Sequence, residues 1–170
     1  MNSGPSDSRL LAGLAAGRRD ALGSLYERHS GLLFSWLMSQ DLTRDEAEDL
    51  LQDSFMALVR RGEYGDIDDL RAWLFGVARN LVARRTRHPT QPLNAAAEPG
   101  EQRSQASAIA VREAMAELPV EQREVVVLKV WHELTFAEIG TLLDISPNTA
   151  SGRYRYALEK LRDLLGEWES

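Results

Sequence analysis

Apolar residues recur along this chain at spacings of three and four, which is the period of an α-helix. No stretch alternates between apolar and polar residues as a β-strand does. The spacing predicts helices over about residues 6–16, 20–40, 43–61, 68–87, 108–118, 120–132, 136–143 and 147–166. We therefore predict an all-α protein.

The helix over residues 68–87 has the most regular pattern in the chain. Its apolar residues fall at relative positions 0, 3, 4, 7, 8, 11 and 12, so they share one face and are expected in the core. These residues are Leu70, Trp73, Leu74, Val77, Ala78, Leu81 and Val82.

Residues 88–107 differ in composition from the segments on either side. They are rich in Pro, Gly, Ala, Gln, Asn and Ser and contain almost no large apolar residue. This composition is typical of a flexible connection. We predict two small helical domains, residues 1–87 and 108–170, joined by a linker over residues 88–107.

Two short helices near the end of the chain carry the sharpest local signal. Thr135 and Glu138 have the spacing of a capping box, in which each side chain accepts a hydrogen bond from the other residue's backbone N–H. The helix that they open stops near Asp144, and Ser146 followed by Pro147 marks the start of the next. Helices joined this closely are typical of a helix-turn-helix, whose second helix lies in the DNA major groove. A helical hairpin with a solvated arginine face has the same pattern and stays an alternative.

The second helix of this motif has an apolar face and a polar face. The residues expected to face inward are Ala150, Tyr154, Ala157, Leu158, Leu161 and Leu165. An outward arginine can pair with guanine edges or with phosphates, and the amides at the Pro147 end suit a phosphate because a helix begins with a positive partial charge. The candidate DNA contacts are Asn148, Ser151, Gly152, Arg153, Arg155 and Tyr156.

Composition excludes several kinds of chemistry. The 170 residues include no cysteine, and the three histidines (His29, His88 and His132) do not have the spacing of metal ligands. We therefore predict no metal site, no cofactor and no catalytic residue. No run of about 18 apolar residues and no secretory leader is present, so we expect no membrane insertion and a cytoplasmic location.

The net charge of −6 weighs against unaided binding to nucleic acid, but the charges are unevenly distributed. Five acids and no base lie between Asp45 and Asp53, whereas five arginines and no acid lie between Leu70 and Ala97. This asymmetry indicates two kinds of partner surface. Ordinary solvated helix faces are the alternative interpretation.

Motifs in both halves resemble the extracytoplasmic-function sigma factors of bacterial RNA polymerase. The resemblance covers about residues 20–166 apart from the linker, and it implies a promoter-recognising subunit that works bound to core polymerase and is not an enzyme. The matching segments are Ala47–Phe55 for region 2.2, Leu70–Leu81 for regions 2.3 and 2.4, and Leu118–Leu128, Leu134–Gly140, Ile145–Thr149 and Arg153–Arg162 for region 4.

The resemblance implies a role for each segment. Region 2.2 docks on the coiled coil of the largest polymerase subunit, and region 4 reads the minus-thirty-five promoter element near the polymerase flap. The positions that match the polymerase-docking surface are Glu46, Asp49, Gln52 and Asp53. The implied partners are core polymerase and promoter DNA, and the sequence leaves open whether an anti-sigma factor also binds.

Regions 2.3 and 2.4 of the family melt and read the minus-ten element. The matching positions are Arg61, Tyr64, Phe75, Arg79, Asn80, Arg84 and Arg87. Tyr64, Phe75 and Asn80 would stack on bases or read their edges, while the arginines would hold phosphates. Packing in the core is an equal alternative for Phe75 and the preferred one for Trp73.

Three departures from the family pattern affect the DNA contacts. Arg84 stands where the family commonly has aspartate, Ala150 stands where valine is more common, and Gly152 lies inside the recognition helix. A polymerase-binding adaptor without DNA recognition therefore remains an alternative. A stand-alone helix-turn-helix regulator is disfavoured by the net charge, and an enzyme on a helical bundle would need a ligand repeat or a nucleophile with a base.

Overall fold

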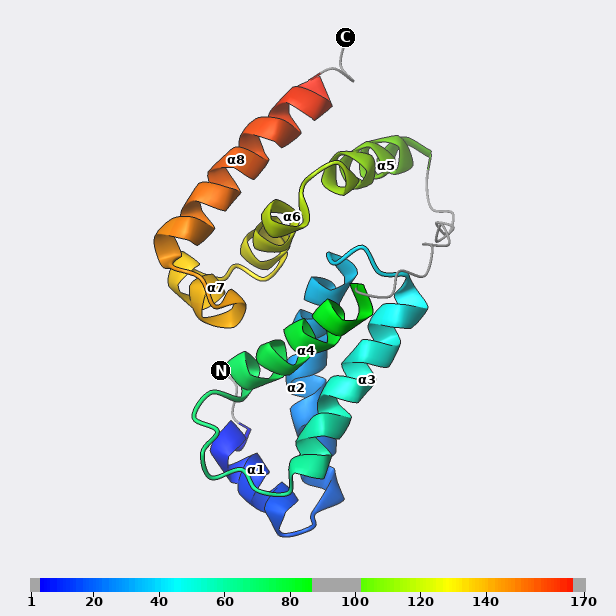
Figure 1. Cartoon of the computed structure of the whole chain (residues 1–170). Helices are drawn as coiled ribbons and strands as arrows, with labels where there is room; N and C mark the ends of the chain where they lie inside the picture. Colours follow the sequence, from blue (N-terminus) through cyan, green and yellow to red (C-terminus); the bar gives the residue numbers. More distant parts are fainter. Residues whose placement is uncertain (1–3, 87–101, 167–170) are drawn as a thin grey trace. The chain divides into compact units, whose positions relative to one another are not determined.

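The structure, a computed structural model, describes residues 4–86 and 102–166, and every regular element in these two ranges is a helix (Figure 1). The all-α prediction is confirmed. Judged by which residues pack together, the molecule divides into two compact units. One consists of residues 1–38 and 44–91, and the other of residues 39–43 and 92–170. The predicted domain limits at residues 87 and 108 stay predictions, because residues 87–101 lie outside the described ranges.

The helices follow the predicted segments closely. The first unit contains α1 (Asp7–Ala15), α2 (Arg19–Met38), α3 (Arg44–Arg61) and α4 (Leu70–Thr86). The second contains α5 (Gln102–Ala116), α6 (Val120–Val126) with its π-helical continuation η1 (Val127–Trp131), α7 (Phe136–Leu143) and α8 (Pro147–Gly166). The start of α5 precedes the predicted start at residue 108, within the segment that we expected to be linker.

The core of the first unit forms where α1, α3 and α4 pack around α2. Leu25, Leu33, Trp36 and Leu37 of α2 are fully buried, as their helical spacing requires. At one end, the loop between α3 and α4 lies beside α1 (Figure 1). This arrangement matters for the site, because that loop contains several of the candidate minus-ten contacts.

The buried face of α4 is shifted from the one that its sequence pattern predicted, although it shares four residues with it. The buried residues are Leu70, Leu74, Phe75, Ala78 and Val82, whereas Trp73, Val77 and Leu81 are only partly buried. The Phe75 ring is 1% exposed and lies 5.4 Å from the Trp36 ring, measured between centroids. α4 packs against both α2 and α3, so the covered face is shifted toward the large Phe75 ring.

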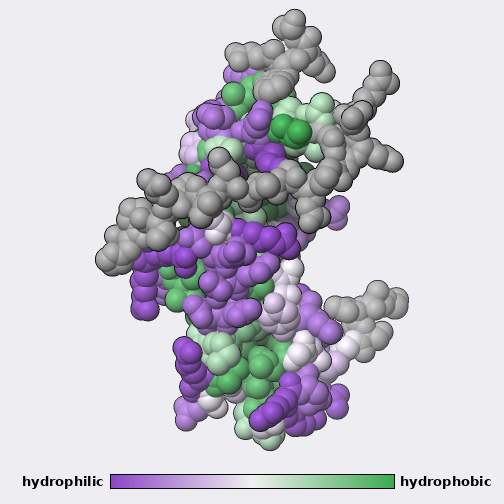
Figure 2. Space-filling view, turned by 90° about the vertical axis from the view of Figure 1, so that its right-hand side faces the viewer, coloured by the Kyte–Doolittle hydropathy of each residue, from purple (hydrophilic) through white to green (hydrophobic). Residues whose placement is uncertain are grey.

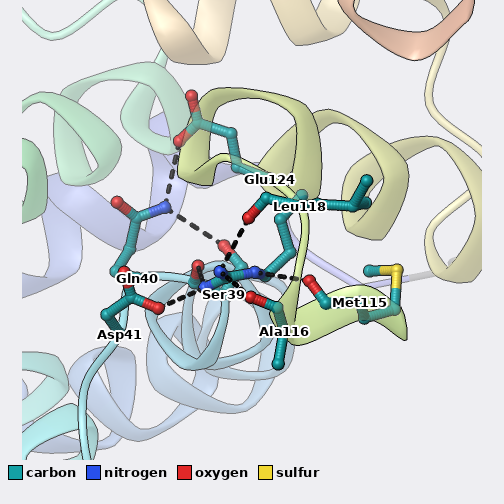
Figure 3. Close-up of polar contacts among 8 residues, drawn as sticks. Ser39, Gln40, Asp41, Met115, Ala116, Leu118 and Glu124 are labelled. Atoms are coloured by element: carbon teal, nitrogen blue, oxygen red, sulfur yellow. Dashed lines mark hydrogen bonds and ion pairs between the residues drawn. The ribbon is translucent and has the colours of Figure 1, made fainter. Parts of the chain in front are cut away.

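Arg123 of α6 organises the second unit (Figure 3). Its guanidinium donates to the carbonyl oxygens of Met115 (2.9 Å), Ala116 (3.1 Å) and Leu118 (2.9 Å), at the end of α5. The last carbonyls of a helix have no partner within the helix, and Arg123 supplies it. The same guanidinium donates to the Ser39 carbonyl and the Asp41 carboxylate, in the short segment that belongs to this unit.

The neighbouring Glu124 is a buried carboxylate with polar partners on two sides. It accepts a 3.0 Å hydrogen bond from the Gln40 side-chain amide and lies 3.7 Å from a guanidinium nitrogen of Arg153, on α8 (Figure 3 shows the Gln40 bond). A buried charge without such partners would be strongly destabilising. The Glu124–Arg153 pair therefore helps to fix the rotation of α8 about its axis.

Arg123→Ala should destabilise the second unit. The Arg123 side chain is 11% exposed, and its removal would take away the hydrogen bonds that it donates to the carbonyls of Ala116 and Leu118. We expect the free energy of unfolding of the second unit to fall by roughly 2–4 kcal/mol. Urea unfolding followed by circular dichroism measures this loss, with exposed Arg162→Ala on α8 as the control, expected within about 0.5 kcal/mol of the parent. Equal effects of the two substitutions would contradict the role of Arg123.

Candidate nucleic-acid interface

α7 and α8 form the helix-turn-helix that the sequence predicts. The Thr135 hydroxyl accepts a 3.1 Å bond from the Glu138 amide, and the Glu138 carboxylate accepts a 2.8 Å bond from the Thr135 amide. This confirms the capping box. α7 ends at Leu143 and is followed by Asp144, which has a left-handed backbone (φ 56°), and α8 starts at Pro147 with the Ser146 hydroxyl accepting from the Thr149 amide.

The turn between these helices folds back tightly on α7. The Ile145 amide donates a 3.0 Å bond to the Gly140 carbonyl. A Cβ placed at Gly140 would lie only 2.6 Å from the Ile145 carbonyl oxygen, so glycine allows this close approach of the two segments. The start of α8 is therefore held directly against α7, as a helix-turn-helix requires.

α8 exposes most of the residues that we proposed as DNA contacts. Asn148, Ser151, Arg155 and Tyr156 are exposed, and the Arg155 guanidinium lies 5.1 Å from the centre of the Tyr156 ring. Gly152 is half-buried. Apart from the adjoining residues of its own helix, no atom lies within 4 Å of the place where its Cβ would be. These side chains form a continuous outward surface on the second helix of the motif.

Two residues of α8 differ from their predicted orientation. Arg153 is half-buried and points toward Glu124, so it contributes to the packing of α8 on α6. Leu158 was expected to face inward, but it is exposed and lines a shallow hollow with Phe136 and Tyr154. That prediction was wrong because α6 and α7 cover a narrower strip of α8 than its apolar residues span.

Two aromatic candidates of the first unit are packed inside it. Phe75 belongs to the core, as described above, and Tyr64 is 9% exposed in the loop that lies against α1. The burial of Phe75 agrees with the alternative that it packs in the core, and the minus-ten role of both rings stays a prediction. Burial of a large ring stabilises the fold, and the spacing of residues in the loop could not reveal that α1 covers Tyr64.

Two of the other minus-ten candidates border a groove between α3 and α4. Asn80 and Arg84 are exposed and line it together with Arg60 and the acidic Asp53, and its apolar floor includes Val77 and Leu81. The sequence analysis did not include Arg60 among the DNA contacts, although it is a basic residue in the last turn of α3, next to the candidate Arg61. Among the remaining candidates, Arg79 is half-buried, Arg61 contacts the loop, and Arg87 lies outside the described residues.

The acidic candidates on α3 fall into two groups. Asp49, Gln52 and Asp53 are exposed, as predicted. Glu46 does not face outward: its side chain is 16% exposed and accepts a 2.8 Å bond from Arg85 of α4. The predicted outward orientation of Glu46 was wrong, because the sequence did not indicate that an arginine of α4 lies opposite this turn.

The outer side of α3 changes character along its length. Its first half is acidic, whereas Met56 and Val59 near its end are exposed apolar residues. Figure 2 views the molecule from the side on which α3 lies in Figure 1, and hydrophilic residues predominate there, with a hydrophobic area in the lower part of the view. A polar surface with an apolar neighbour is typical of a site for a protein partner.

Comparisons with known proteins agree with this arrangement. The family model for "Sigma-70 region 2" matches residues 25–89, and the model for "Sigma-70, region 4" matches residues 108–161. The chain is 32% identical over 167 residues to the ECF RNA polymerase sigma factor SigM of Mycobacterium tuberculosis, a match that covers 95% of this chain and 85% of SigM. This chain is an extracytoplasmic-function sigma factor.

Other relatives of this sigma factor support the assignment. The RNA polymerase sigma factor CarQ of Myxococcus xanthus is 34% identical over 164 residues, covering 90% of this chain and 94% of CarQ. Among solved structures, CnrH in complex with the cytosolic domain of CnrY has a TM-score of 0.72 and 26% identity, covering 95% of this chain and 97% of CnrH. CnrH is a sigma factor of Cupriavidus metallidurans.

As a member of this family, the sigma factor directs promoter recognition and transcription initiation by RNA polymerase, and it is not an enzyme. Its region 4 is the DNA-binding unit that contains α7 and α8. In residues 4–86 and 102–166, no helix of this sigma factor is long and apolar enough to cross a lipid bilayer.

Gly152→Ala should stabilise α8 of the sigma factor. Glycine inside a helix costs roughly 0.5–1 kcal/mol relative to alanine, and the space for a methyl group is open. We expect the free energy of unfolding to rise by about that amount in urea titrations. Gly62→Ala is the opposite control, because Gly62 has a φ of +73° and alanine is strained there. A loss of stability in Gly152→Ala would contradict the open position seen at this residue.

Proposed function

We propose that this sigma factor divides its work between the two units. Residues 1–87 act as region 2, which docks on core polymerase and holds the opened minus-ten strand, and residues 108–170 act as region 4, which reads the duplex minus-thirty-five element. Residues 88–107 serve as the linker. The observation that carries the proposal is the outward surface of α8 within a complete helix-turn-helix. Its place of action is the cytoplasm, where core polymerase works.

The docking surface for polymerase is the exposed acidic side of α3. Asp49 lies one helical turn before Gln52 and Asp53 on it, and all three are solvent-accessible. Carboxylates on such a face suit the basic surface of the coiled coil in the largest polymerase subunit, because arginine–carboxylate pairs give orientation and specificity. Glu46 supports this surface indirectly, through its ion pair with Arg85. The polymerase flap is the second contact, and it binds region 4.

The opened minus-ten strand is held by the groove between α3 and α4. Asn80 offers an amide that can read a base edge, and Arg60 and Arg84 can contact phosphates on the rim of the groove. With Tyr64 and Phe75 buried, polar contacts carry more of the binding than stacking does. Arg84, where the family commonly has aspartate, strengthens the basic character of the groove. This favours promoter contact over an adaptor that has lost DNA recognition.

The duplex minus-thirty-five element is read by the start of α8. Asn148 and Ser151 can bond base edges or phosphates there, and Arg155 can pair with guanine or with a phosphate. Arg153 acts indirectly, because its pairing with Glu124 fixes the rotation of the helix. The net charge of −6 favours a protein that binds promoter DNA only together with polymerase over a regulator that binds DNA alone.

An anti-sigma factor is a further proposed partner. CnrH was solved with the cytosolic domain of CnrY, and RpoE of Bartonella quintana was solved with the anti-sigma factor NepR. A regulator of this class would keep the present chain from polymerase until a signal releases it.

Charge reversal on α3 tests the docking surface. Asp49→Arg combined with Asp53→Arg should weaken binding to core polymerase by at least roughly tenfold, because two interfacial ion pairs become repulsive. Fluorescence anisotropy of labelled sigma factor with core polymerase measures the affinity, and circular dichroism checks that helix content is unchanged. Asp20→Arg with Glu27→Arg makes the same charge change at exposed positions of α2 and should leave the affinity nearly unaltered. Equal affinities for both double variants would show that the α3 face is only solvated.

Two single variants test the assignment of duplex and opened-strand contacts. Arg155→Ala should weaken binding of holoenzyme to closed promoter duplex, with each lost contact worth about 1–3 kcal/mol. Asn80→Ala should preserve closed-complex affinity but lower the fraction of permanganate-reactive, melted promoter, because its base becomes accessible only after unstacking.

Pre-melted templates provide the control for this pair. They should bypass part of an opening defect, so the Asn80→Ala holoenzyme should form a larger fraction of open complexes on pre-melted templates than on duplex templates. They cannot restore a lost duplex contact, so the defect of Arg155→Ala should persist. The same defect for both variants on both templates would refute the division between the two units.

A further inference from the structure

The loop between α3 and α4 is short and fixed at both ends. α3 ends at Arg61, and Gly62 turns the chain with a left-handed backbone (φ +73°). At the other end, the Asp69 carboxylate accepts a 3.0 Å bond from the Ala72 amide and so caps the first turn of α4. The conformation of residues 62–68 therefore depends on contacts made across the loop.

One guanidinium makes most of these contacts. Nε of Arg61 donates a 2.8 Å bond to the Glu63 carbonyl, and Nη2 donates to both carboxylate oxygens of Asp66. The guanidinium carbon lies 5.6 Å from the centre of the Trp73 ring, in the first turn of α4. Arg61 thus connects the beginning of the loop, its far side and the helix that follows.

The inner side of the loop is held by packing. The Ile67 amide donates a 3.0 Å bond to the Tyr64 carbonyl, and both of these side chains are buried against α1. Glu63, Gly65 and Asp66 stay exposed. The loop therefore presents one defined outer surface, with Arg61 bound along it.

The electrostatics of Arg61 differ from those of an arginine available to DNA. Its charge is already neutralised by Asp66, and its hydrogen bond lowers the pKa of the Asp66 carboxyl, which keeps that group ionised. A phosphate would have to displace a carboxylate that is held by two bonds to the same nitrogen. Arg60 and Arg84 border the groove, which the Asp53 carboxylate also lines.

We propose that Arg61 and Asp66 form a clasp that positions the loop between α3 and α4, and that Arg61 is a positioning residue and not a phosphate contact. The clasp contributes to the base preference of the sigma factor in the minus-ten element, because it restricts the outer side of the loop, while the packing of Tyr64 and Ile67 holds the inner side. This inference rests on the proposed function, in which region 2 holds the opened minus-ten strand, and it adds the loop, which contains the matching positions Arg61 and Tyr64, to the surface that contacts that strand.

The experiment compares Arg61→Ala, Asp66→Asn and the double variant in reconstituted holoenzyme. Transcription from a promoter library with a randomised minus-ten element gives base preference, and affinity for pre-melted promoter is measured at several salt concentrations. We expect both single variants to flatten base preference to the same extent, with roughly three- to fivefold loss of discrimination, and the double variant to be no worse than either. Glu63→Gln, which neutralises an exposed acid of the same loop outside the clasp, should leave the preference unchanged.

A direct phosphate contact would give a different result. Arg61→Ala alone would then weaken binding to all sequences and reduce the slope of log affinity against log salt by about one, while Asp66→Asn would leave affinity equal or higher. That pattern would overturn the clasp. Asp66 is exposed and its substitution preserves volume, so the Asp66→Asn variant tests the proposal even if Arg61→Ala unfolds.

Asn80→Ala separates failure of the clasp from failure of the proposed function. If Asn80→Ala impairs opening while both clasp variants keep the parent's base preference, the clasp is wrong and the minus-ten assignment stands. If Asn80→Ala has no effect on opening and the clasp variants keep the parent's preference, the assignment of this surface to the minus-ten element is wrong and the clasp is overturned with it.

Discussion

The second unit depends on two adjacent charged residues of α6 that face different neighbours. Arg123 satisfies the carbonyls at the end of α5, and Glu124 pairs with Arg153 of α8. Buried charges are tolerated only when they are fully partnered, so these contacts restrict how α5 and α8 can pack on α6. The outward face of α8 agrees with that restriction, because rotating α8 would separate Arg153 from Glu124 and expose the buried Ala150 and Ala157.

Local signals allowed the elements to be predicted from the sequence. The capping box at Thr135 and Glu138 and the Ser146–Pro147 pair each act within four residues, so tertiary packing has little opportunity to override them. The exposed positions of Asp49, Gln52 and Asp53 were predictable for a related reason. They lie opposite the strongly apolar stripe of α3, which includes Leu50 and Phe55.

The errors in the predicted site arose where another element decides the environment. Helical periodicity shows that α4 has an apolar side, but it does not show that α2 and α3 together cover Phe75 and leave Trp73 partly exposed. Glu46 and Tyr64 were placed incorrectly for the same reason, since Arg85 and α1 approach them from distant parts of the sequence. The resemblance to a family identified the right segments without indicating which side chains in them are accessible.

The burial of these aromatic rings changes how the proposed minus-ten surface would hold an opened strand. Stacking on an aromatic side chain is worth about 1–3 kcal/mol per base, and neither Tyr64 nor Phe75 offers a free ring. Binding must then come from hydrogen bonds and phosphate contacts, whose strength falls steeply with small errors in distance and angle. A surface that relies on such contacts needs a backbone held in one conformation, because hydrogen bonds tolerate little displacement. The contacts that Arg61 makes across the loop meet that requirement.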